Sequence, residues 1–431
     1  MVSEWLSYQV FDLLTNGDIL IGDGYRAKNE ELSAQGIPFA RAGNINGGFN
    51  FEGTDCFPKK DLYKLGNKIS QPGDVVFTSK GTVGRFAFVT EDMQSFAYSP
   101  QLCFWRSLNR ALIEPKYLYY WMTGPEFFHQ YNSVKGQTDM ADYVSLSNQR
   151  RMYITLPSIH EQNSIADILG SLDDKIELNR RTSATLKESA RALFKSWFVD
   201  FDPVRAKMES RQPDGIDAET ATLFPDRLVE SELGLIPEGW EIKPLDEIAD
   251  FLNGLPLQKY PAEDEKFLPA IKIRELRQGY ADETSDRISP KIDPNYVIND
   301  GDVIFSWSGS LLVDIWSGGV GALNQHLFKV SSESYPKWFY YLWVVHHLQD
   351  FQRIAEGKAT TMGHIQRHHL SAAKTFVPPE LVLQAMSRIM EPILYEQLSR
   401  NLNSRTLVTT RDVLLPKLLS GKIQVLGEHL W

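Results

Sequence analysis

The hydrophobic pattern of the chain alternates between two kinds of segment, and each kind occurs twice. Short runs of β-branched and aromatic residues, such as 75–78 and 86–89, are separated by Gly, Pro and Asn, which is typical of short strands joined by turns. A longer segment after residue 158 has apolar or small residues at alternating steps of four and three. That spacing indicates the seam of a long helix that packs against another helix. The pattern therefore predicts an α+β fold.

The helical seam occurs in two related segments, Leu172–Trp197 and, 221 residues later, Ile393–Leu418. Each seam has apolar ends and a polar middle, with Asn179 in the first helix and Ser404 in the second. Polar residues in a seam cost stability, but they can fix the register of a helix pair. The apolar seam positions are Leu172, Ile176, Leu186, Leu193 and Trp197 in the first helix, and Ile393, Leu407, Leu414 and Leu418 in the second.

Repeated motifs indicate that the whole chain is a duplication of a unit of about 220 residues. Gly73-Asp74-Val75 recurs as Gly301-Asp302-Val303, 228 residues later. The other matches follow in the same order, with separations that fall from 235 to 221 residues, as small loop insertions and deletions would produce. They pair Trp5 with Trp240, Asn16-Gly17 with Asn253-Gly254, Arg41 with Lys272, Gln101 with Gln325, Pro115 with Pro336, Gly136 with Gly357 and Pro157 with Pro378.

One long helix cannot bury its seam alone, so we expect the two related helices to pack against each other. The duplication suggests a pseudo-twofold axis, which makes the two helices antiparallel and puts one β-rich domain at each end of the pair. The domains are expected at residues 1–157 and 240–379, the helices at 158–199 and 380–431, and a linker rich in Pro and Gly at 200–239.

Composition and charge narrow the class of protein. The chain has 431 residues, more than one domain usually contains, and 42% of them are hydrophobic, as in folded globular proteins. The sequence contains no apolar run of about 18 residues, no signal-peptide pattern and only two cysteines, so we expect a cytoplasmic protein without disulfides. The net charge is −10 and no segment is strongly basic, so any contact with nucleic acid must come from local loops.

Four motifs resemble the specificity subunit of type I restriction–modification systems, and the resemblance covers essentially the whole chain. They are the stretch Leu156–Asn179, the block Leu193–Phe201, the segment Ile236–Trp240 and the tail Leu414–Ile423. The resemblance implies two target recognition domains, each reading one half of a bipartite, asymmetric site in double-stranded DNA. It also implies that the helices dock two methyltransferase subunits, through which restriction–translocase subunits join the complex.

The resemblance further implies that this chain is not an enzyme on its own and has no catalytic residues. S-adenosylmethionine, ATP and Mg²⁺ are then expected on the partner subunits, and no cofactor is expected on this chain. Helix geometry agrees with such an assembly, because the seam Leu172–Trp197 is roughly 38 Å long at 1.5 Å per residue. That length is close to one turn of DNA, about 34–36 Å, so the helices could set the spacing of the two half-sites.

The loop after the Gly-Asp-Val strand is the strongest candidate for DNA contact in each copy. Residues 78–85 combine two glycines, which permit close approach of the backbone, with hydroxyl groups and cations that suit phosphates and base edges. Arginine is suited to guanine and an amide to adenine, whereas Arg41, Lys272 and Arg274 are expected at phosphates. Ordinary solvated loops are the alternative. The candidates are Arg41, Ser79, Lys80, Thr82, Arg85, Gln101, Gln137 and Thr138 in the first copy, and Lys272, Arg274, Trp307, Ser308, Ser310, Gln325 with its neighbour His326, Lys358 and Thr360 in the second.

Two weaker signals point to other chemistry. Asp226 followed by Glu241 and Lys243 matches a loose pattern of Mg²⁺-dependent nucleases, but the first copy has no counterpart of Glu241. Three histidines at positions 364, 368 and 369 also lack counterparts, so we predict no metal site. Two alternatives remain open: the DNA-reading part of a fused or two-subunit restriction enzyme of another type, with its own nicking or modifying activity, and a duplicated protein-binding adaptor.

Overall fold

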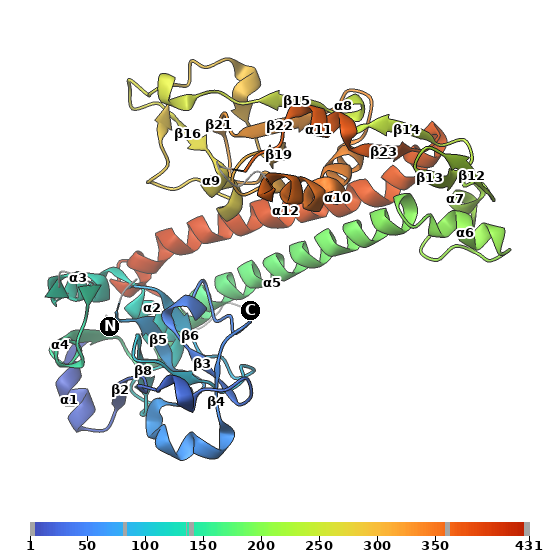
Figure 1. Ribbon diagram of the computed structural model, residues 1–431. Coiled ribbons are helices and arrows are strands. Elements are labelled where there is room, and N and C mark those ends of the chain that lie inside the picture. Colours follow the sequence, from blue (N-terminus) through green and yellow to red (C-terminus); the bar gives the residue numbers. More distant parts are fainter. Residues whose placement is uncertain (1–4, 81–83, 135, 138–141, 358–362, 426–431) are drawn as a thin grey trace. The chain divides into compact units, whose positions relative to one another are not determined.

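The computed structural model describes residues 5–80, 84–134, 136–137, 142–357 and 363–425. The chain divides into two compact units, one formed by Met1–Lys175 with Leu407–Trp431 and the other by Ile176–Thr406 (Figure 1). Two helices of 40 residues, α5 (Ile159–Phe198) and α12 (Glu380–Leu419), each contribute one end to each unit. None of the helices within the described ranges is long and apolar enough to cross a membrane.

The first unit contains a sheet-rich domain. Its four-stranded sheet has the order β2 (Ile19–Asp23), β8 (Leu102–Ser107), β5 (Val75–Thr78) and β6 (Phe86–Phe88). A three-stranded sheet has the order β4 (Cys56–Phe57), β3 (Ile37–Ala40) and β7 (Ala97–Tyr98), and β1 (Leu6–Gln9) pairs with β11 (Tyr153–Leu156). The remaining elements are α1 (Val10–Thr15), α2 (Pro115–Met122), α3 (Pro125–Val134), the pair β9 (Gly136–Gln137) and β10 (Asp142–Tyr143), and α4 (Leu146–Gln149).

The second unit contains a domain with the same succession of strands. Its first sheet has the order β15 (Asp250–Asn253), β22 (Leu327–Ser331), β19 (Val303–Ser306) and β20 (Val313–Ile315). The next has β17 (Arg287–Ile288), β16 (Leu268–Ile271), β21 (Gly321–Leu323) and β18 (Val297–Ile298), and β14 (Glu241–Pro244) pairs with β23 (Lys374–Val377). The helices are α8 (Leu245–Ile248), α9 (Ile273–Gln278), α10 (Lys337–Glu356) and α11 (Arg367–Ala372). The expected α+β class, with two sheet-rich domains and a long helix between them in the chain, is confirmed.

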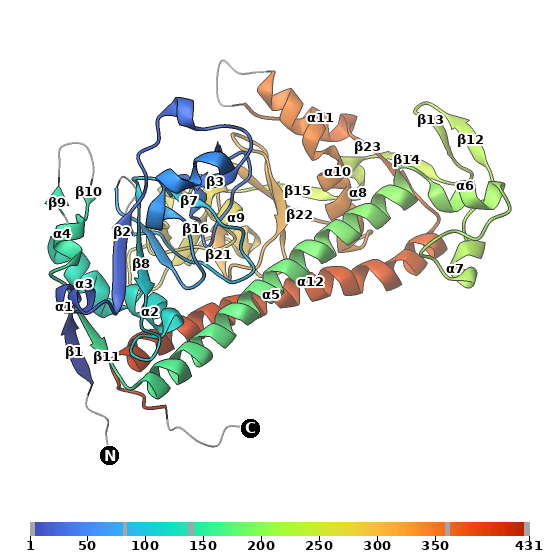
Figure 2. The same cartoon turned by 90° about the horizontal axis from the view of Figure 1, so that it is seen from below.

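Within each unit, the ends of α5 and α12 lie side by side and run in opposite directions (Figure 2). In the first unit the Asp173 carboxylate of α5 pairs with Arg411 of α12 at 2.8 Å. In the second unit the buried Asn179 donates from Nδ2 to Oδ1 of Asn403 at 2.8 Å. All nine predicted apolar seam positions are buried or half-buried. The polar middle of the helix pair therefore consists of specific side-chain contacts between the two helices.

Each unit completes its hydrophobic core with a helix end that belongs to the other sequence repeat. Leu418 and Leu419 of α12 are buried in the core of the first unit, beside Leu169 of α5. A Cβ added to Gly124, between α2 and α3, would lie 2.4 Å from the Leu419 side chain, so this glycine makes room for it. In the second unit, aromatic residues of α5 pack with α10 and with the first half of α12. These buried α5 residues are Phe194, Trp197 and Phe198.

Residues 200–239, expected as a linker, are folded and form part of the second unit. They contain α6 (Asp202–Met208), α7 (Ala218–Thr222) and the hairpin β12 (Leu228–Ser231) with β13 (Gly234–Pro237). Phe201, Val204 and Phe224 are buried in the same core as Trp240. The prolines and glycines that indicated a linker therefore stand at the turns of a small folded connection whose apolar residues contribute to the core.

One of the repeat matches is wrong, because Gly254 corresponds to Gly24 and not to Gly17. The N–H of Gly24 donates to the carbonyl of Leu102, and that of Gly254 donates to the carbonyl of Leu327. A Cβ on either glycine would lie within 2.3 Å of a carbonyl oxygen of the neighbouring segment, so both positions require glycine. Gly17 has no atom that near its missing Cβ and stands in a turn after α1.

The Gly-Asp motif that reveals the duplication forms the same turn in both domains. Gly73 and Gly301 have φ angles of 93° and 92°, and each following aspartate accepts a hydrogen bond from the backbone N–H three residues before it. The partners of the two carboxylates differ. Asp74 is fully buried and binds Arg106 through two hydrogen bonds of 2.5 and 2.7 Å, whereas the partly exposed Asp302 pairs with Lys329 at 3.0 Å. The motif is therefore a structural element of each sheet.

Replacing Asp74 by Asn should destabilise the first unit by about 3–5 kcal/mol, because Arg106 would remain buried without a counter-ion. Asp302→Asn is the matched variant and should cost about 1 kcal/mol or less, since its ion pair is accessible to water. Urea unfolding, with hydrogen exchange to locate the affected unit, measures both. Equal losses from the two substitutions would contradict this interpretation of the buried pair.

Candidate functional site

The structure brings several predicted residues of the second domain together around one cleft of about 360 Å³. Lys272 and Arg274, at the start of α9, contribute two cations, and Gln325 and His326 come from the turn before β22. Leu257, Gln258, Ile273, Asp286 and Asn324 complete the lining. Cations, an amide and an imidazole thus face one concave surface, which is the combination that suits a nucleotide with its phosphate.

The loop after β19 is connected to this cleft through hydrogen bonds. Ser308 Oγ lies 2.9 Å from His326 Nδ1, and the Trp307 N–H donates to the carbonyl of His326. The Trp307 indole N–H donates to Asn253 Oδ1 at 2.9 Å, while its ring lies against the rings of His326 and Phe328. Trp307 and Ser308 therefore support the cleft from behind.

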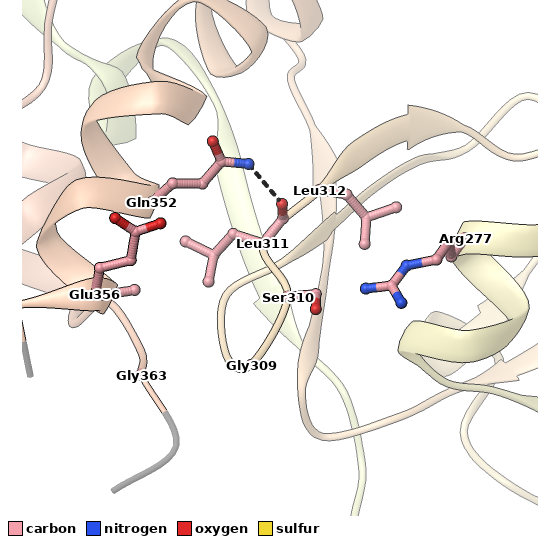
Figure 3. Close-up of a pocket in the computed structure, with 9 residues that line it drawn as sticks. Arg277, Gly309, Ser310, Leu311, Leu312, Gln352, Glu356 and Gly363 are labelled. Carbon is pink, nitrogen blue, oxygen red and sulfur yellow. Dashed lines mark hydrogen bonds between the residues drawn. The ribbon is translucent and has the colours of Figure 1, made fainter. Parts of the chain in front are cut away.

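Ser310, in the same loop, lines a second cleft of about 590 Å³ (Figure 3). Figure 3 shows the loop between Arg277 of α9 on one side and Gln352 and Glu356 of α10 on the other. Gln352 donates to the carbonyl of Leu311 at 3.0 Å and so holds the end of the loop. Because Arg274 and Arg277 face different clefts, α9 contributes a cation to each of them.

In the first domain, the predicted residues lie around the corresponding turn. Gln101 is exposed, and its Oε1 accepts a hydrogen bond from the backbone N–H of Ala42 at 3.2 Å. Lys80 and Arg85 are also exposed, and Arg85 donates to the carbonyl of Ile45 at 3.4 Å. Ser79 is buried and its hydroxyl donates to the carbonyl of Gln101, so it supports the turn.

Four predicted contact residues lie outside the described residues: Thr82, Thr138, Lys358 and Thr360. Gln137 belongs to the short strand β9, but its side chain also falls outside the described part.

The match of Gln101 with Gln325 is off by one residue. The N–H of Ser79 donates to the carbonyl of Gln101, whereas the equivalent N–H of Trp307 donates to the carbonyl of His326. The strand register agrees, since Val75 pairs with Trp105 and Val303 with Val330. His326 is therefore the counterpart of Gln101, and the two glutamines stand at neighbouring backbone positions.

The three cations expected at phosphates are each paired with a carboxylate of the same domain. Arg41 pairs with Asp55 at 2.8 Å and Lys272 with Asp286 at 2.5 Å, and these two pairs occupy equivalent positions next to β3 and β16. Arg274 pairs with Glu275 at 2.6 Å. The Lys272 ammonium lowers the pKa of Asp286 by its hydrogen bond. Because Arg41 and Lys272 and their carboxylate partners are about half exposed, these pairs are weak and a phosphate can replace the carboxylate.

The residues that suggested a nuclease or a metal site do not form one cluster. Glu241 pairs with Lys243 on β14 at 3.0 Å, and the rings of His368 and His369 lie 3.9 Å apart on α11. In the described part of the chain, no three His, Cys, Asp or Glu side chains are placed to hold a metal ion.

Comparison with known proteins identifies a family. Residues 9–188 and 237–404 match the type I restriction modification DNA specificity domain. The Haemophilus influenzae type I restriction enzyme HindI specificity subunit is 25% identical over 84% of this chain and 89% of its own length. The MjaIX specificity subunit of Methanocaldococcus jannaschii is 25% identical over 85% of this chain and 81% of its own. The crystal structure of the type I S subunit from M. genitalium shares the fold, with a TM-score of 0.54 and 14% identity over 97% of this chain and 96% of that one.

Asp286→Asn should tighten binding to duplex DNA of unrelated sequence, because it frees Lys272 to meet a phosphate. One additional phosphate contact should steepen the dependence of log K on log salt by about 0.9. Titration of a labelled duplex at several salt concentrations measures both quantities. Asp264→Asn is the control, since it makes the same charge change at an exposed residue outside the cleft. Equal effects of the two substitutions would mean that only overall charge matters.

Proposed function

The chain belongs to the type I restriction–modification DNA specificity family and is a DNA-recognition subunit, and we propose that each of its two domains reads one half of a bipartite, asymmetric site. The observation that carries this proposal is the duplicated scaffold with different side chains at equivalent exposed positions. Arg41 and Gln101 in the first domain are replaced by Lys272 and His326 in the second. Two domains of one fold with different reading groups suit two half-sites of different sequence.

The contacts that we assign to DNA are of two kinds. Lys80, Arg85 and Gln101 in the first domain and Gln325 in the second are the base-edge candidates, because their side chains are exposed or line the cleft. Arg41, Lys272 and Arg274 are the backbone candidates, which exchange their carboxylate partners for phosphates. Ser79, Trp307 and Ser308 support the turns that carry these groups.

The helices α5 and α12 serve as the docking surface for two methyltransferase subunits, through which restriction–translocase subunits join. Both helices expose large apolar side chains that a soluble helix pair does not need, which supports a protein partner. They are Leu178 on α5 and Leu381, Tyr395 and Val413 on α12, each at least half exposed. The chain contributes recognition and assembly, whereas cleavage and adenine methylation with their ATP, Mg²⁺ and S-adenosylmethionine belong to the partner subunits.

Lys80→Ala or Arg85→Ala should relax the reading of one half-site and leave the other unchanged, because both residues belong to the first domain. A lost bidentate contact to guanine costs about 1–3 kcal/mol of discrimination. Sequencing of methylated sites after assembly with the methyltransferase partner measures this. Lys272→Ala is the matched variant in the second domain and should weaken binding without a preference for base. Equal relaxation of both halves by Arg85→Ala would contradict the assignment of one half-site to each domain.

A four-residue insertion after Ser183 should increase the spacer between the half-sites by one or two base pairs. It lengthens α5 by roughly 6 Å and keeps the seam nearly in phase. The half-site sequences should stay unchanged, as methylation of duplexes with spacers of different length can show. If the folded insertion variant methylated only sites with the original spacer, another part of the complex would set the distance.

A further inference from the structure

His326 stands between two side chains, and both of its ring nitrogens are engaged. Ser308 Oγ lies 2.9 Å from Nδ1, and the amide nitrogen of Gln325 lies 3.3 Å from Nε2. An amide N–H can only donate, so Nε2 accepts and the ring proton is on Nδ1, from which it is donated to Ser308. The three side chains therefore form a chain of hydrogen bonds with a defined direction.

The far end of this chain is held rigidly. Ser308 is buried, its carbonyl accepts a hydrogen bond from the Ser306 hydroxyl, and its backbone forms a β-bridge with His364. The backbone N–H of His326 donates to Asn324 Oδ1 at 3.1 Å, and Trp307 covers one side of the ring. A ring fixed at these points fixes the group that donates to it, the amide of Gln325.

Pinning one N–H of Gln325 leaves its other N–H and its carbonyl oxygen for the cleft, which Gln325 lines together with Lys272 and Arg274. One N–H and one carbonyl oxygen are the pair that an amide uses in a bidentate contact with the N7 and N6 of adenine. In the first domain, the backbone N–H of Ala42 holds the amide of Gln101 by its oxygen instead. Both domains thus present a held glutamine amide, but from neighbouring backbone positions and by opposite ends.

We propose that His326 is a positioning residue that orients the Gln325 amide to read one adenine in the half-site of the second domain. This inference rests on the proposed function, because it assigns one group within the half-site that this domain reads. Ser308 sets the direction of the relay, and the cations of the cleft hold the adjacent phosphates.

The test uses the chain assembled with its methyltransferase partner and a library of duplexes randomised in both half-sites, with sequencing of the methylated products. His326→Phe keeps a ring beside Trp307 but removes both nitrogens. We expect it to reduce the preference for adenine about 10-fold at one position of one half-site, because the amide is no longer held. Ser308→Ala should weaken the same position by a smaller factor. His368→Phe, an exposed histidine of α11 outside the cleft, should change no position.

Gln325→Glu provides a readout that a merely structural role of His326 would not move. A carboxylate can only accept, so the preference at that position should change from adenine to cytosine, whose N4 amino group donates. His326 can reverse its proton and donate to the carboxylate, so the change should depend on His326 and disappear in the double variant with His326→Phe. A full change to cytosine in that double variant would overturn the positioning role.

Exchange of residues 240–379 for the corresponding domain of the Haemophilus influenzae relative separates this inference from the function on which it rests. If the exchange changes one half-site but His326→Phe changes no position, the domain reads DNA and only the role of His326 is wrong. If the exchange leaves both half-sites unchanged, the second domain does not read DNA and the proposed function itself fails.

Discussion

The exchange of helix ends between the two sequence repeats is the constraint on which the rest of this structure depends. The core of the first unit requires Leu418 and Leu419 from the last helix, and the core of the second requires Phe194 and Trp197 from the central one. Burial of each such side chain contributes about 1.5–3 kcal/mol, which is a large share of the stability of a domain. Neither repeat can therefore complete its fold from its own residues. The two recognition domains are obligatorily joined by continuous helices, as a protein that reads two sites at a fixed spacing needs.

The duplication preserves backbone geometry and lets exposed side chains diverge. Gly24 and Gly254 face a carbonyl oxygen that excludes any Cβ, and the aspartates of the Gly-Asp turns bind the same backbone N–H. These positions allow few substitutions. At the turn that follows, Gln101 and His326 share one backbone environment, but only their side chains reach the surface. A scaffold of this kind can change what it reads without changing how it folds.

The electrostatics of the site favour discrimination over affinity. The chain has a net charge of −10, and Arg41, Lys272 and Arg274 are each paired with a nearby carboxylate. Every phosphate contact must therefore displace an existing partner, which reduces the sequence-independent attraction to DNA. Base contacts then determine a larger part of the difference between a correct site and other DNA. An acidic protein that recognises DNA is consistent with this balance.

Periodicity and repetition in the sequence determined the class of fold, the two sheet-rich domains and the long helices, because these features depend on local spacing and on burial of one face. The sequence also pointed to the turn that contains Gln325. Only the tertiary structure decided which residues correspond. Gly254 matches Gly24 and Gln101 matches His326, since strand pairing sets the register and a one-residue shift is invisible to a motif of common residues. The folded segment 200–239 and the carboxylate partners of the cations also required the structure. Those contacts join residues that are distant in the chain, and no local pattern records them.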